Sequence, residues 1–366
     1  MIGLLTRLDG TNFGTSLQAW ALQKKLRELA PDAEVFNYCE YSWRARVKFA
    51  LWDALGALAG WMGRSGVFAS GRRQRVGFRH FEREFIRPNG AKTCRRSALA
   101  KRARKYSLCV CGSDQIWNPY QYNPRMFLDF CADGTFLASY APSIGVAHWH
   151  GRDEAVRRHL KRFSLLSVRE EQGRALIAQL TDAPCRVVAD PALLPTVEEW
   201  RQLTGAKPPL AEKPYVLSYF LGGGDYPKRF LAGLKERRGC RIVNVRMFYG
   251  RPLGEGDLYV NDPVEFLRLV ENAECVCTNS YHGTLFSLLF GREFFTFRRA
   301  YGSEAMAETG RVTELLAQAG VPERYLAADA AFCEAPEFDR AQVAEKLEAF
   351  RAESLDFLRE VAAKDV

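Results

Sequence analysis

His282 has a residue type and a setting that suit acid–base chemistry. Residues 275–277 form a short apolar run, and the polar residues 278–280 that end it favour the start of a helix. His282 is therefore expected in the first turn of an apolar helix, at the carboxyl end of a strand, where open α/β sheets bind ligands. The free N–H groups and the helix dipole there attract phosphate or carboxylate, and a histidine beside a bound anion exchanges protons near neutral pH. Alternatively, the imidazole only caps the turn.

Two charged residues in the first half of the chain also follow predicted strands. Asp114 comes after the strand 106–111, where a carboxylate can orient a hydroxyl group or take its proton. The alternative for Asp114 is an Asx-turn. Arg169 lies where the predicted strand 165–171 closes, and its guanidinium can clamp a carboxylate or phosphate, or pair with Glu170 or Glu171.

Two glycine-containing turns are candidates for binding through the backbone. Residues 9–14 lie between a strand and a helix, but their spacing is not the dinucleotide fingerprint, so no nicotinamide or flavin is expected. Gly14 permits a close approach of the backbone to a ligand, or simply a tight turn. The sequence Gly-Gly-Gly-Asp at 222–225 follows another strand and frees N–H groups for an anion.

Strands alternate with helices along the chain, which predicts an α/β fold with Rossmann-like domains. At 366 residues the chain exceeds the size of one hydrophobic core, so two domains are expected. An N-terminal domain at 1–195 and a C-terminal domain at 215–338 are separated by a linker rich in Pro and Gly at 196–214, and a charged helix follows at 339–366. The predicted strands are 1–5, 33–38, 106–111, 136–140, 165–171, 215–221, 242–246, 275–277 and 294–297, and the predicted helices include 16–29, 152–163, 226–237, 263–272 and 308–316. Residues 187–194, with Asp190-Pro191, form the last unit of the N-terminal domain.

Residues 42–107 carry the positive charge of the chain. They hold 17 Lys and Arg against three acids, a net charge of +14, whereas the whole chain carries +9. Apolar residues recur there at helical spacing beside basic ones, with Trp43, Trp52 and Trp61 on or near the same helix, which resembles an interfacial membrane helix. The alternatives are an amphipathic helix packed on the first domain with a solvated basic face, and nucleic-acid binding, for which no motif is present.

The cysteines and the hydropathy bear on the compartment. Ten cysteines are scattered, and two Cys-x-Cys pairs fall within predicted strands, which suits buried small side chains better than disulfides or zinc. No ligand cluster such as His-x-x-His is present, so no metal is expected. No apolar run reaches the roughly 18–20 residues of a membrane span, and no signal peptide precedes the first strand. We therefore expect a cytoplasmic protein. Peripheral contact with the inner face of the membrane through residues 42–107 is a further expectation.

Six stretches, in chain order, resemble the polysaccharide pyruvyl transferase family. The most specific are Gly-Ser-Asp-Gln-Ile-Trp-Asn-Pro at 112–119 and Ser-Tyr-His-Gly-Thr-Leu-Phe-Ser at 280–287. The family's Gly-Arg helix start is loosely matched at Gly310-Arg311. The resemblance implies two Rossmann-like domains facing a cleft, as in glycosyltransferases of the B type. The other stretches are Gly-Thr-Asn-Phe-Gly-Thr-Ser-Leu-Gln-Ala at 10–19, Ser-Tyr-Ala-Pro-Ser-Ile-Gly at 139–145, Ser-Val-Arg-Glu at 167–170 and Asp-Pro-Ala-Leu-Leu at 190–194.

The resemblance also implies a reaction, the transfer of pyruvate from phosphoenolpyruvate to two sugar hydroxyls as a ketal during cell-surface polysaccharide biosynthesis, without a cofactor. By this resemblance His282 is an acid/base and Arg169 binds the donor anion. Ketal formation requires proton transfers, which His282 and Asp114 from opposite domains are expected to share. The N-terminal domain is expected to bind the acceptor, a sugar or lipid-linked oligosaccharide, and the C-terminal domain the donor. The remaining substrate-binding candidates are Asn12, Gly14, Ser113, Ser280, Gly222 and Gly223.

Two other functions fit the same pattern. A glycosyltransferase with a nucleotide-sugar donor uses the same two-domain scaffold, because a fold does not determine a function. A non-catalytic member of a polysaccharide assembly complex is also consistent with the fold. The presence of His282, Asp114 and Arg169 at strand ends favours an enzyme.

Overall fold

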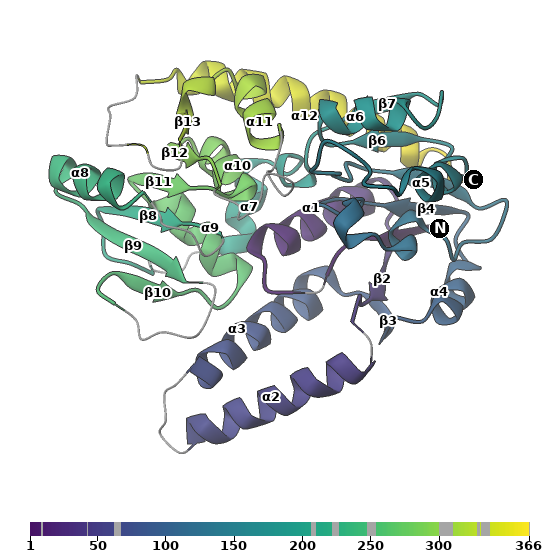
Figure 1. The fold of residues 1–366 in the computed structure, drawn as a ribbon, viewed down its shortest axis with the longest axis horizontal. Helices are drawn as coiled ribbons and strands as arrows, with labels where there is room; N and C mark the ends of the chain where they lie inside the picture. The colour runs from purple at the N-terminus through teal and green to yellow at the C-terminus, as the bar shows by residue number, and fades with distance from the viewer. Residues whose placement is uncertain are drawn as a thin grey trace.

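The protein is described here by a computed structural model, which has two parallel β-sheets lying side by side with helices packed against them (Figure 1). The predicted α/β fold with two Rossmann-like domains is confirmed. Both sheets bring the carboxyl ends of their strands toward the junction between the domains, so the turns that follow the strands meet there. The structure describes residues 1–8, 10–41, 43–61, 67–205, 210–221, 227–246, 254–299, 310–327, 330 and 337–365.

The N-terminal sheet has the strand order β3-β2-β1-β4-β5, and all its pairs are parallel. β1 is central, and Leu4 lies opposite Val35 of β2 and Val110 of β4. A parallel two-stranded sheet of β6 and β7 continues from it. The strands are β1 (Ile2–Leu5), β2 (Glu34–Tyr38), β3 (Asn89–Thr93), β4 (Leu108–Cys111), β5 (Phe136–Ser139), β6 (Leu166–Val168) and β7 (Cys185–Val187).

The C-terminal sheet has the order β10-β9-β8-β11-β12-β13 and is also parallel. Cys277 of β11 lies opposite Ser218 of β8 and Phe295 of β12. Both Cys-x-Cys pairs are buried in their strands as free thiols, as their alternation predicted. The strands are β8 (Tyr215–Tyr219), β9 (Arg241–Arg246), β10 (Asp257–Tyr259), β11 (Cys275–Thr278), β12 (Glu293–Phe297) and β13 (Tyr325–Leu326).

The helices cover both sheets and meet at an aromatic junction. Phe13, at the start of α1, stacks on Phe266 of α9 at 4.9 Å between ring centroids and on Phe78 of α3 at 5.3 Å. One continuous apolar core therefore joins the two domains. The α-helices are α1 (Phe13–Leu29), α2 (Trp43–Trp61), α3 (Val67–Phe81), α4 (Arg96–Ala103), α5 (Asp153–Leu160), α6 (Glu171–Ala178), α7 (Val197–Thr204), α8 (Lys228–Arg238), α9 (Pro263–Asn272), α10 (Tyr281–Leu289), α11 (Arg311–Ala319) and α12 (Arg340–Ala362).

The short helical turns complete the chain, and one of them lies in the last predicted unit of the N-terminal domain. That unit, 187–194, starts at the last residue of β7 and continues into a 3-10 turn capped by Asp190, whose carboxylate accepts a hydrogen bond from the Ala192 N–H at 2.9 Å. Pro191 then favours the turn over further strand. The turns are η1 (Glu82–Ile86), η2 (Pro119–Gln121), η3 (Pro124–Phe127), η4 (Pro191–Leu193) and η6 (Pro322–Arg324).

Two predicted segments have more structure than the sequence indicated. The predicted linker 196–214 contains α7, whose first turn is fixed by a capping box between Thr196 and Glu199 and whose Trp200 is fully buried. The basic segment 42–107 is not a separate insertion, because β3 and α4 within it belong to the N-terminal sheet and its cover.

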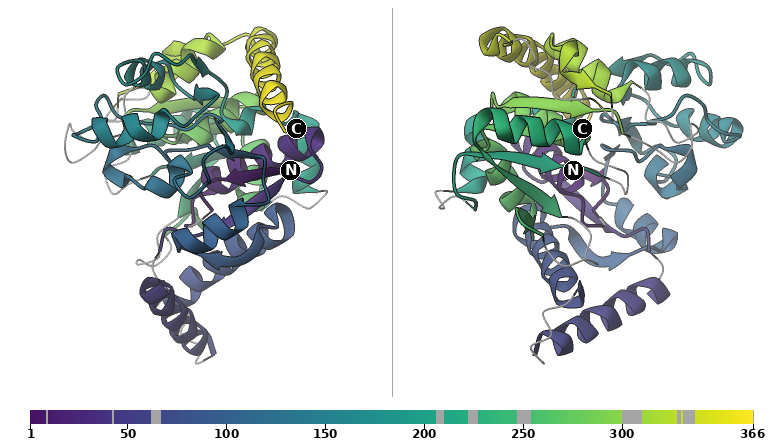
Figure 2. Two further views of the ribbon diagram at one scale, coloured as in Figure 1. Left: turned by 90° about the vertical axis from the view of Figure 1, so that its right-hand side faces the viewer. Right: turned by 60° about the vertical axis from the view of Figure 1, so that its left-hand side comes forward.

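Helix α12 returns the chain from the C-terminal domain to the N-terminal one (Figure 2). Its Ser354 hydroxyl accepts a hydrogen bond from the Ala189 N–H at 2.8 Å. Just beyond the helix, the Asp365 carboxylate pairs with the N-terminal amine at 2.5 Å. The two ends of the chain are therefore tied together on one domain.

Candidate active site

His282 is presented by the first turn of α10, as its position in the sequence predicted. The Ser280 hydroxyl caps this helix by accepting a hydrogen bond from the Gly283 N–H at 3.3 Å. The imidazole is almost fully buried, and its Nε2 lies 3.5 Å from Oδ2 of Asp190. Because 3.5 Å is long for a hydrogen bond, the two groups attract each other chiefly through charge.

Asp190 is the carboxylate at the centre of the cluster. Its side chain is completely buried, and Oδ2 accepts a hydrogen bond from Nη1 of Arg169 at 2.5 Å. Burial alone would raise the pKa of Asp190, but the positive charges of His282 and Arg169 outweigh burial and hold this pKa below its usual range. Asp190 is therefore an anion that joins a residue of each domain.

Arg169 has unused hydrogen-bonding capacity inside the protein. Its side chain is 2% exposed, and its guanidinium lies 4.3 Å from the ring centroid of Tyr281. Burial alone would lower the pKa of Arg169, but Asp190 and the other nearby acidic groups raise it, so the residue stays charged. Within the described parts of the chain, its Nε and Nη2 atoms make no hydrogen bond, and neither does Nε2 of His282. Buried donors of this kind are rare unless a ligand or ion satisfies them.

Asp114 contributes a second carboxylate from the N-terminal domain. It has a positive φ of 68°, and its oxygens accept hydrogen bonds from the Thr15 hydroxyl at 2.5 Å and from the Gln115 N–H at 2.8 Å. Burial alone would raise the pKa of Asp114, but the charges of Arg169 and His282 lower it overall. The Ile116 N–H donates to the Asp114 backbone carbonyl and not to its side chain, so Asp114 does not form the Asx-turn, and its carboxylate lies in the electric field of the cluster.

Gly14 explains how the two domains come so close at this point. A Cβ atom built on Gly14 would lie 2.1 Å from Nδ1 of His282, well inside van der Waals contact. In the structure, the backbone of Gly14 therefore approaches the His282 side chain of the other domain. The first turn of α1 packs directly against the His282 ring because residue 14 has no side chain.

A second pair of contacts joins the domains beside the cluster. With the Gln115 amide oriented to satisfy both groups, its oxygen accepts hydrogen bonds from Nη1 and Nη2 of Arg311 at 3.1 and 3.0 Å. The Glu314 carboxylate accepts the Glu171 N–H at 2.7 Å, at the start of α6. The loosely matched residue Arg311 thus lies at the domain junction.

The remaining predicted substrate-binding residues have partners within the protein. The Asn12 side chain caps α1 through the Thr15 N–H at 3.2 Å. The Ser113 hydroxyl is buried and donates to the Ala141 carbonyl at 2.6 Å. Gly222 and Gly223 lie outside the described residues. Substrate contacts by these four residues and by Ser280 remain predictions.

Asp190 is the residue that sequence reasoning missed, although the stretch 190–194 contributes to the family resemblance. An Asp before Pro is common at turns, so its type alone did not indicate an ion pair with a residue 92 positions away. Tyr281 was also missed as a partner of Arg169, although it adjoins His282. These contacts depend on how the domains meet, which spacing along the chain does not encode.

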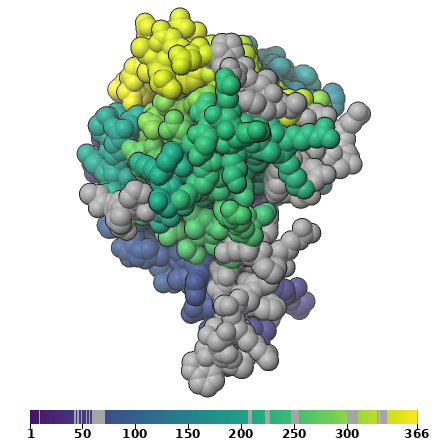
Figure 3. All heavy atoms as spheres, turned by 90° about the vertical axis from the view of Figure 1, so that its left-hand side faces the viewer, coloured from purple at the N-terminus to yellow at the C-terminus, as the bar shows by residue number. Residues whose placement is uncertain are grey.

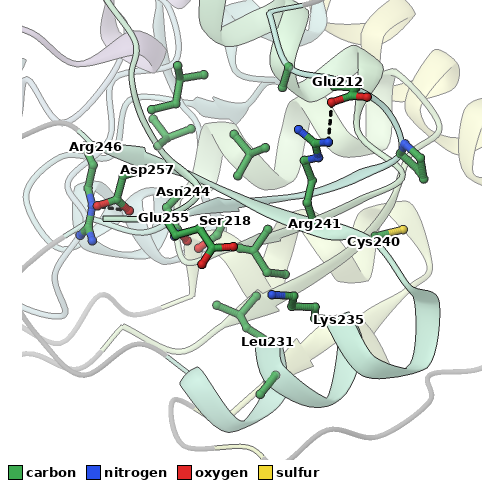
Figure 4. Close-up of a pocket in the computed structure, with 18 of the residues that line it drawn as sticks. Glu212, Ser218, Leu231, Lys235, Cys240, Arg241, Asn244, Arg246, Glu255 and Asp257 are labelled. Atoms are coloured by element: carbon green, nitrogen blue, oxygen red, sulfur yellow. Dashed lines mark hydrogen bonds and ion pairs between the residues drawn. The ribbon is translucent and has the colours of Figure 1, made fainter. Parts of the chain in front are cut away.

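A large hollow in the described structure lies elsewhere, in the C-terminal domain. It has a volume of about 1520 Å³ and is lined by strands β8–β10 and helix α8, with Ser218, Asn244 and Lys235 facing it (Figure 4). None of Asp114, Arg169, Asp190 and His282 is among its described lining residues. Within the described chain, no group of three His, Cys, Asp or Glu side chains is placed to hold a metal ion.

Comparison with known protein families decides the family of the chain. The family model described as polysaccharide pyruvyl transferase matches residues 12–301. The chain belongs to the polysaccharide pyruvyl transferase family. The resemblance carried by the six stretches is thereby confirmed, and membership implies transferase activity. No curated protein sequence matches the chain.

Solved structures share the fold. A putative UDP-N-acetylglucosamine 2-epimerase from Listeria monocytogenes is similar with a TM-score of 0.50 and 10% identity, over 98% of this chain and 89% of that one. The glycosyltransferase SnogD from Streptomyces nogalater has a TM-score of 0.45 and 14% identity, over 100% of this chain and 98% of that one. At these identities the likeness concerns the fold alone.

Proposed function

We propose that this protein transfers pyruvate from phosphoenolpyruvate to two sugar hydroxyls as a ketal. The observation that carries the proposal is the set of buried nitrogen atoms on Arg169 and His282 that make no hydrogen bond in the described structure, where the two domains meet. Phosphoenolpyruvate carries a carboxylate and a phosphate, whose oxygens match a guanidinium fork and a neighbouring imidazole. The start of α10 adds positive potential on the same side.

The proposed reaction fixes what the protein has to supply. The vinyl carbon of phosphoenolpyruvate gains a proton and becomes a methyl group, and the first sugar oxygen bonds to the central carbon. The bond from that carbon to the phosphate oxygen then breaks, and the second sugar oxygen takes its place. The two hydroxyls lose two protons. One of them replaces the proton that the methyl group has gained, and the other leaves with phosphate. The residues must therefore deliver one proton, accept another and stabilise a positive centre between the two steps.

The cluster has a group for each of these tasks. In the proposed mechanism His282 moves the proton at the donor, and Asp190 keeps the imidazole oriented. Asp114 is ionised at neutral pH, because its pKa is below the usual range. From the domain opposite His282, it can accept the proton of a sugar hydroxyl. The anionic pair of Asp114 and Asp190 would also stabilise the positively charged centre.

A hollow in the N-terminal domain supports a sugar acceptor on that side. It has a volume of about 750 Å³ and is lined by several tyrosines, among them Tyr38, Tyr120 and Tyr122. Aromatic rings with a few polar groups suit the faces and hydroxyls of a sugar. On its rim, Glu40 pairs at 3.0 Å with Arg7, whose charge also helps to lower the pKa of Asp114.

Thermal unfolding with different donors tests the proposal. Phosphoenolpyruvate should raise the melting temperature, since a ligand at a hundred times its Kd stabilises by about 2.7 kcal/mol, whereas a nucleotide-sugar should not. Arg169→Lys keeps the charge but loses the planar fork, so it should weaken the effect of phosphoenolpyruvate. The exposed Arg174→Lys is the matched control. A shift with the nucleotide-sugar alone would overturn the proposal in favour of a glycosyltransferase, and no shift with either would favour a non-catalytic protein.

A further inference from the structure

Helices α2 and α3 form a hairpin at the edge of the molecule (Figure 1). α2 packs along α3 and lies on the outer side of the pair, away from both sheets. The turned views show the hairpin projecting from the body, and in the space-filling view the purple atoms of α2 lie at the opposite end from α12 (Figures 2 and 3).

The described surface of α2 carries a row of exposed apolar side chains. Four aliphatic side chains lie on one side of the helix at spacings of three and four residues, and each is between 48% and 60% exposed. Trp52, beside them, is 47% exposed. Contiguous apolar surface of this kind is rare on soluble monomers and marks an interaction site. The four side chains, called here the α2 stripe, are Val47, Leu51, Leu55 and Leu58.

The hairpin is also strongly basic. Helices α2 and α3 carry seven Lys and Arg and a single acid, Asp53. On α2, Nζ of Lys48 lies 6.0 Å from the ring centroid of Trp52, so a cation borders the stripe. On α3, Arg72 and Arg73 are exposed. An apolar stripe bordered by cations is typical of a helix that lies in the headgroup region of a bilayer.

The inner face of α3 fastens the hairpin to the body without using the α2 stripe. Phe78 stacks on Phe13, and the Gln74 amide donates to the Val260 carbonyl at 3.2 Å. A Cβ on Gly77 would lie 2.4 Å from a backbone oxygen of the C-terminal domain, so the contact is close. The α2 stripe is therefore not needed to hold the hairpin in place.

We propose that α2 docks on the surface of an anionic lipid bilayer, with the α2 stripe among the headgroups and the neighbouring Lys and Arg on lipid phosphates. Charge complementarity favours this partner over a second copy of the chain, because pairing two α2 helices would bring two basic hairpins together. The contact is peripheral, since no helix in the described parts of the chain is long and apolar enough to cross a membrane.

The hairpin lies close to the domain junction, so binding of α2 to a bilayer would bring the candidate active site near the membrane. Phe13, on which α3 rests, immediately precedes Gly14, which touches His282. A lipid-linked acceptor on the bilayer would therefore meet the enzyme beside the domain junction. The meeting with a lipid-linked acceptor rests on the proposed function, whereas binding of α2 to lipid does not. The experiment below measures lipid binding independently of the proposed reaction.

Co-sedimentation with vesicles tests the docking surface. The full chain is mixed with vesicles of phosphatidylcholine alone or with phosphatidylglycerol added, at low and high salt. It should sediment with the anionic vesicles, more at low salt. Leu51→Glu with Leu55→Glu should reduce the bound fraction about tenfold or more, and Lys48→Glu about fivefold at low salt. Since all three side chains are exposed, the variants should fold normally, which the melting temperature verifies.

Matched variants identify the surface. Leu29→Glu and Arg158→Glu change exposed residues of the same types elsewhere and should bind like the unaltered protein. His282→Ala, which removes the proposed acid/base, should also sediment normally, so failure of the proposed reaction would leave this result intact. Recovery in the supernatant under all conditions would overturn the proposal, as would equal binding to neutral vesicles. A dimer in solution that Leu51→Glu dissociates, without vesicle binding, would assign the stripe to a second copy.

Discussion

The cluster around His282 and the surface of α2 depart from the usual distribution of side chains in two different ways. The cluster buries an arginine, a histidine and an aspartate at the junction of the domains, whereas α2 exposes a row of aliphatic side chains. Burying charges costs free energy unless they are paired, and exposing apolar surface forgoes the stabilisation of burial. Departures from the folding pattern of this kind concentrate at functional sites.

The two regions also differ in how they are assembled. The cluster takes residues from both domains and closes only when Gly14 meets His282, so it depends on the whole fold. The α2 stripe comes from one helix, and its four side chains are exposed. Substitutions in the cluster should therefore change both activity and stability, whereas substitutions on α2 should change neither and affect only docking.

His282→Ala should have the largest effect. Removing an acid/base should lower the rate of pyruvyl transfer about 10²–10⁴-fold, while the donor still binds through Arg169. The measurement is turnover with phosphoenolpyruvate, together with the thermal shift that the donor produces. His80→Ala, an exposed histidine of α3, is the control. Near-normal turnover by His282→Ala would remove this residue from the mechanism.

Asp190→Asn should be the most destabilising change. It leaves the Arg169 charge buried without its closest partner, which costs about 3–5 kcal/mol in the free energy of unfolding. The pKa of Asp190 is lower in the folded than in the unfolded protein, so its contribution is present above about pH 4 and is lost as the pH falls. In urea unfolding, the unaltered protein should therefore have a higher free energy of unfolding than Asp190→Asn at neutral pH, and this difference should narrow below about pH 4.

The exposed Asp133→Asn is the control for the loss of a carboxylate, and it should follow the unaltered protein at every pH. A gap for Asp190→Asn that stayed constant from neutral pH into the acid range would mean that the Asp190 charge does not stabilise the junction.

Gly14→Ala tests the contact between the domains. The new methyl group would overlap the His282 ring, so it should force a shift that costs about 1–3 kcal/mol and lower turnover. Gly173→Ala is the matched control, because its Cβ would make ordinary contacts of 3.4 Å or more within α6. Thermal unfolding and turnover should both distinguish the variants. Equal behaviour of the two would show that α1 does not press on His282.

Leu51→Glu should have the smallest effect on the protein itself. Its side chain is 60% exposed, and surface substitutions usually change the free energy of unfolding by less than about 0.5 kcal/mol. The melting temperature and the turnover with a water-soluble acceptor should match the unaltered protein. A large fall in melting temperature would mean that the stripe packs against the body, which would erase the contrast between the two regions.

The sequence predicted the elements better than their meeting points. The strand from Cys275, the helix from Pro263 and the place of His282 follow from local patterns that the structure retains. The approach of Gly14 to His282 and the pairing of Asp190 with Arg169 arise when the domains pack together. Nothing in the spacing of those residues encodes that contact. The helix in the predicted linker was missed because its Pro and Gly neighbours mask a capping box at Thr196.

The basic segment shows the same limit. Its composition indicated a basic amphipathic helix, and both membrane contact and packing on the first domain fitted that pattern. The structure shows α2 exposed along the residues described and packed on α3. The side chains of Trp43 and Trp61 lie outside the described residues, so the interpretation rests on Trp52 and the α2 stripe.

The most direct test of the central claim is to follow isotopically labelled phosphoenolpyruvate by NMR with the full chain and a set of sugar acceptors, including lipid-linked ones. The proposed mechanism predicts that phosphate is released only when an acceptor with two suitably placed hydroxyls is present. The label should then appear in the methyl group of a ketal, and His282→Ala should abolish both signals. Phosphoenolpyruvate that stays intact while a nucleotide-sugar is consumed, or a ketal formed equally fast by His282→Ala, would contradict the assignment of this site.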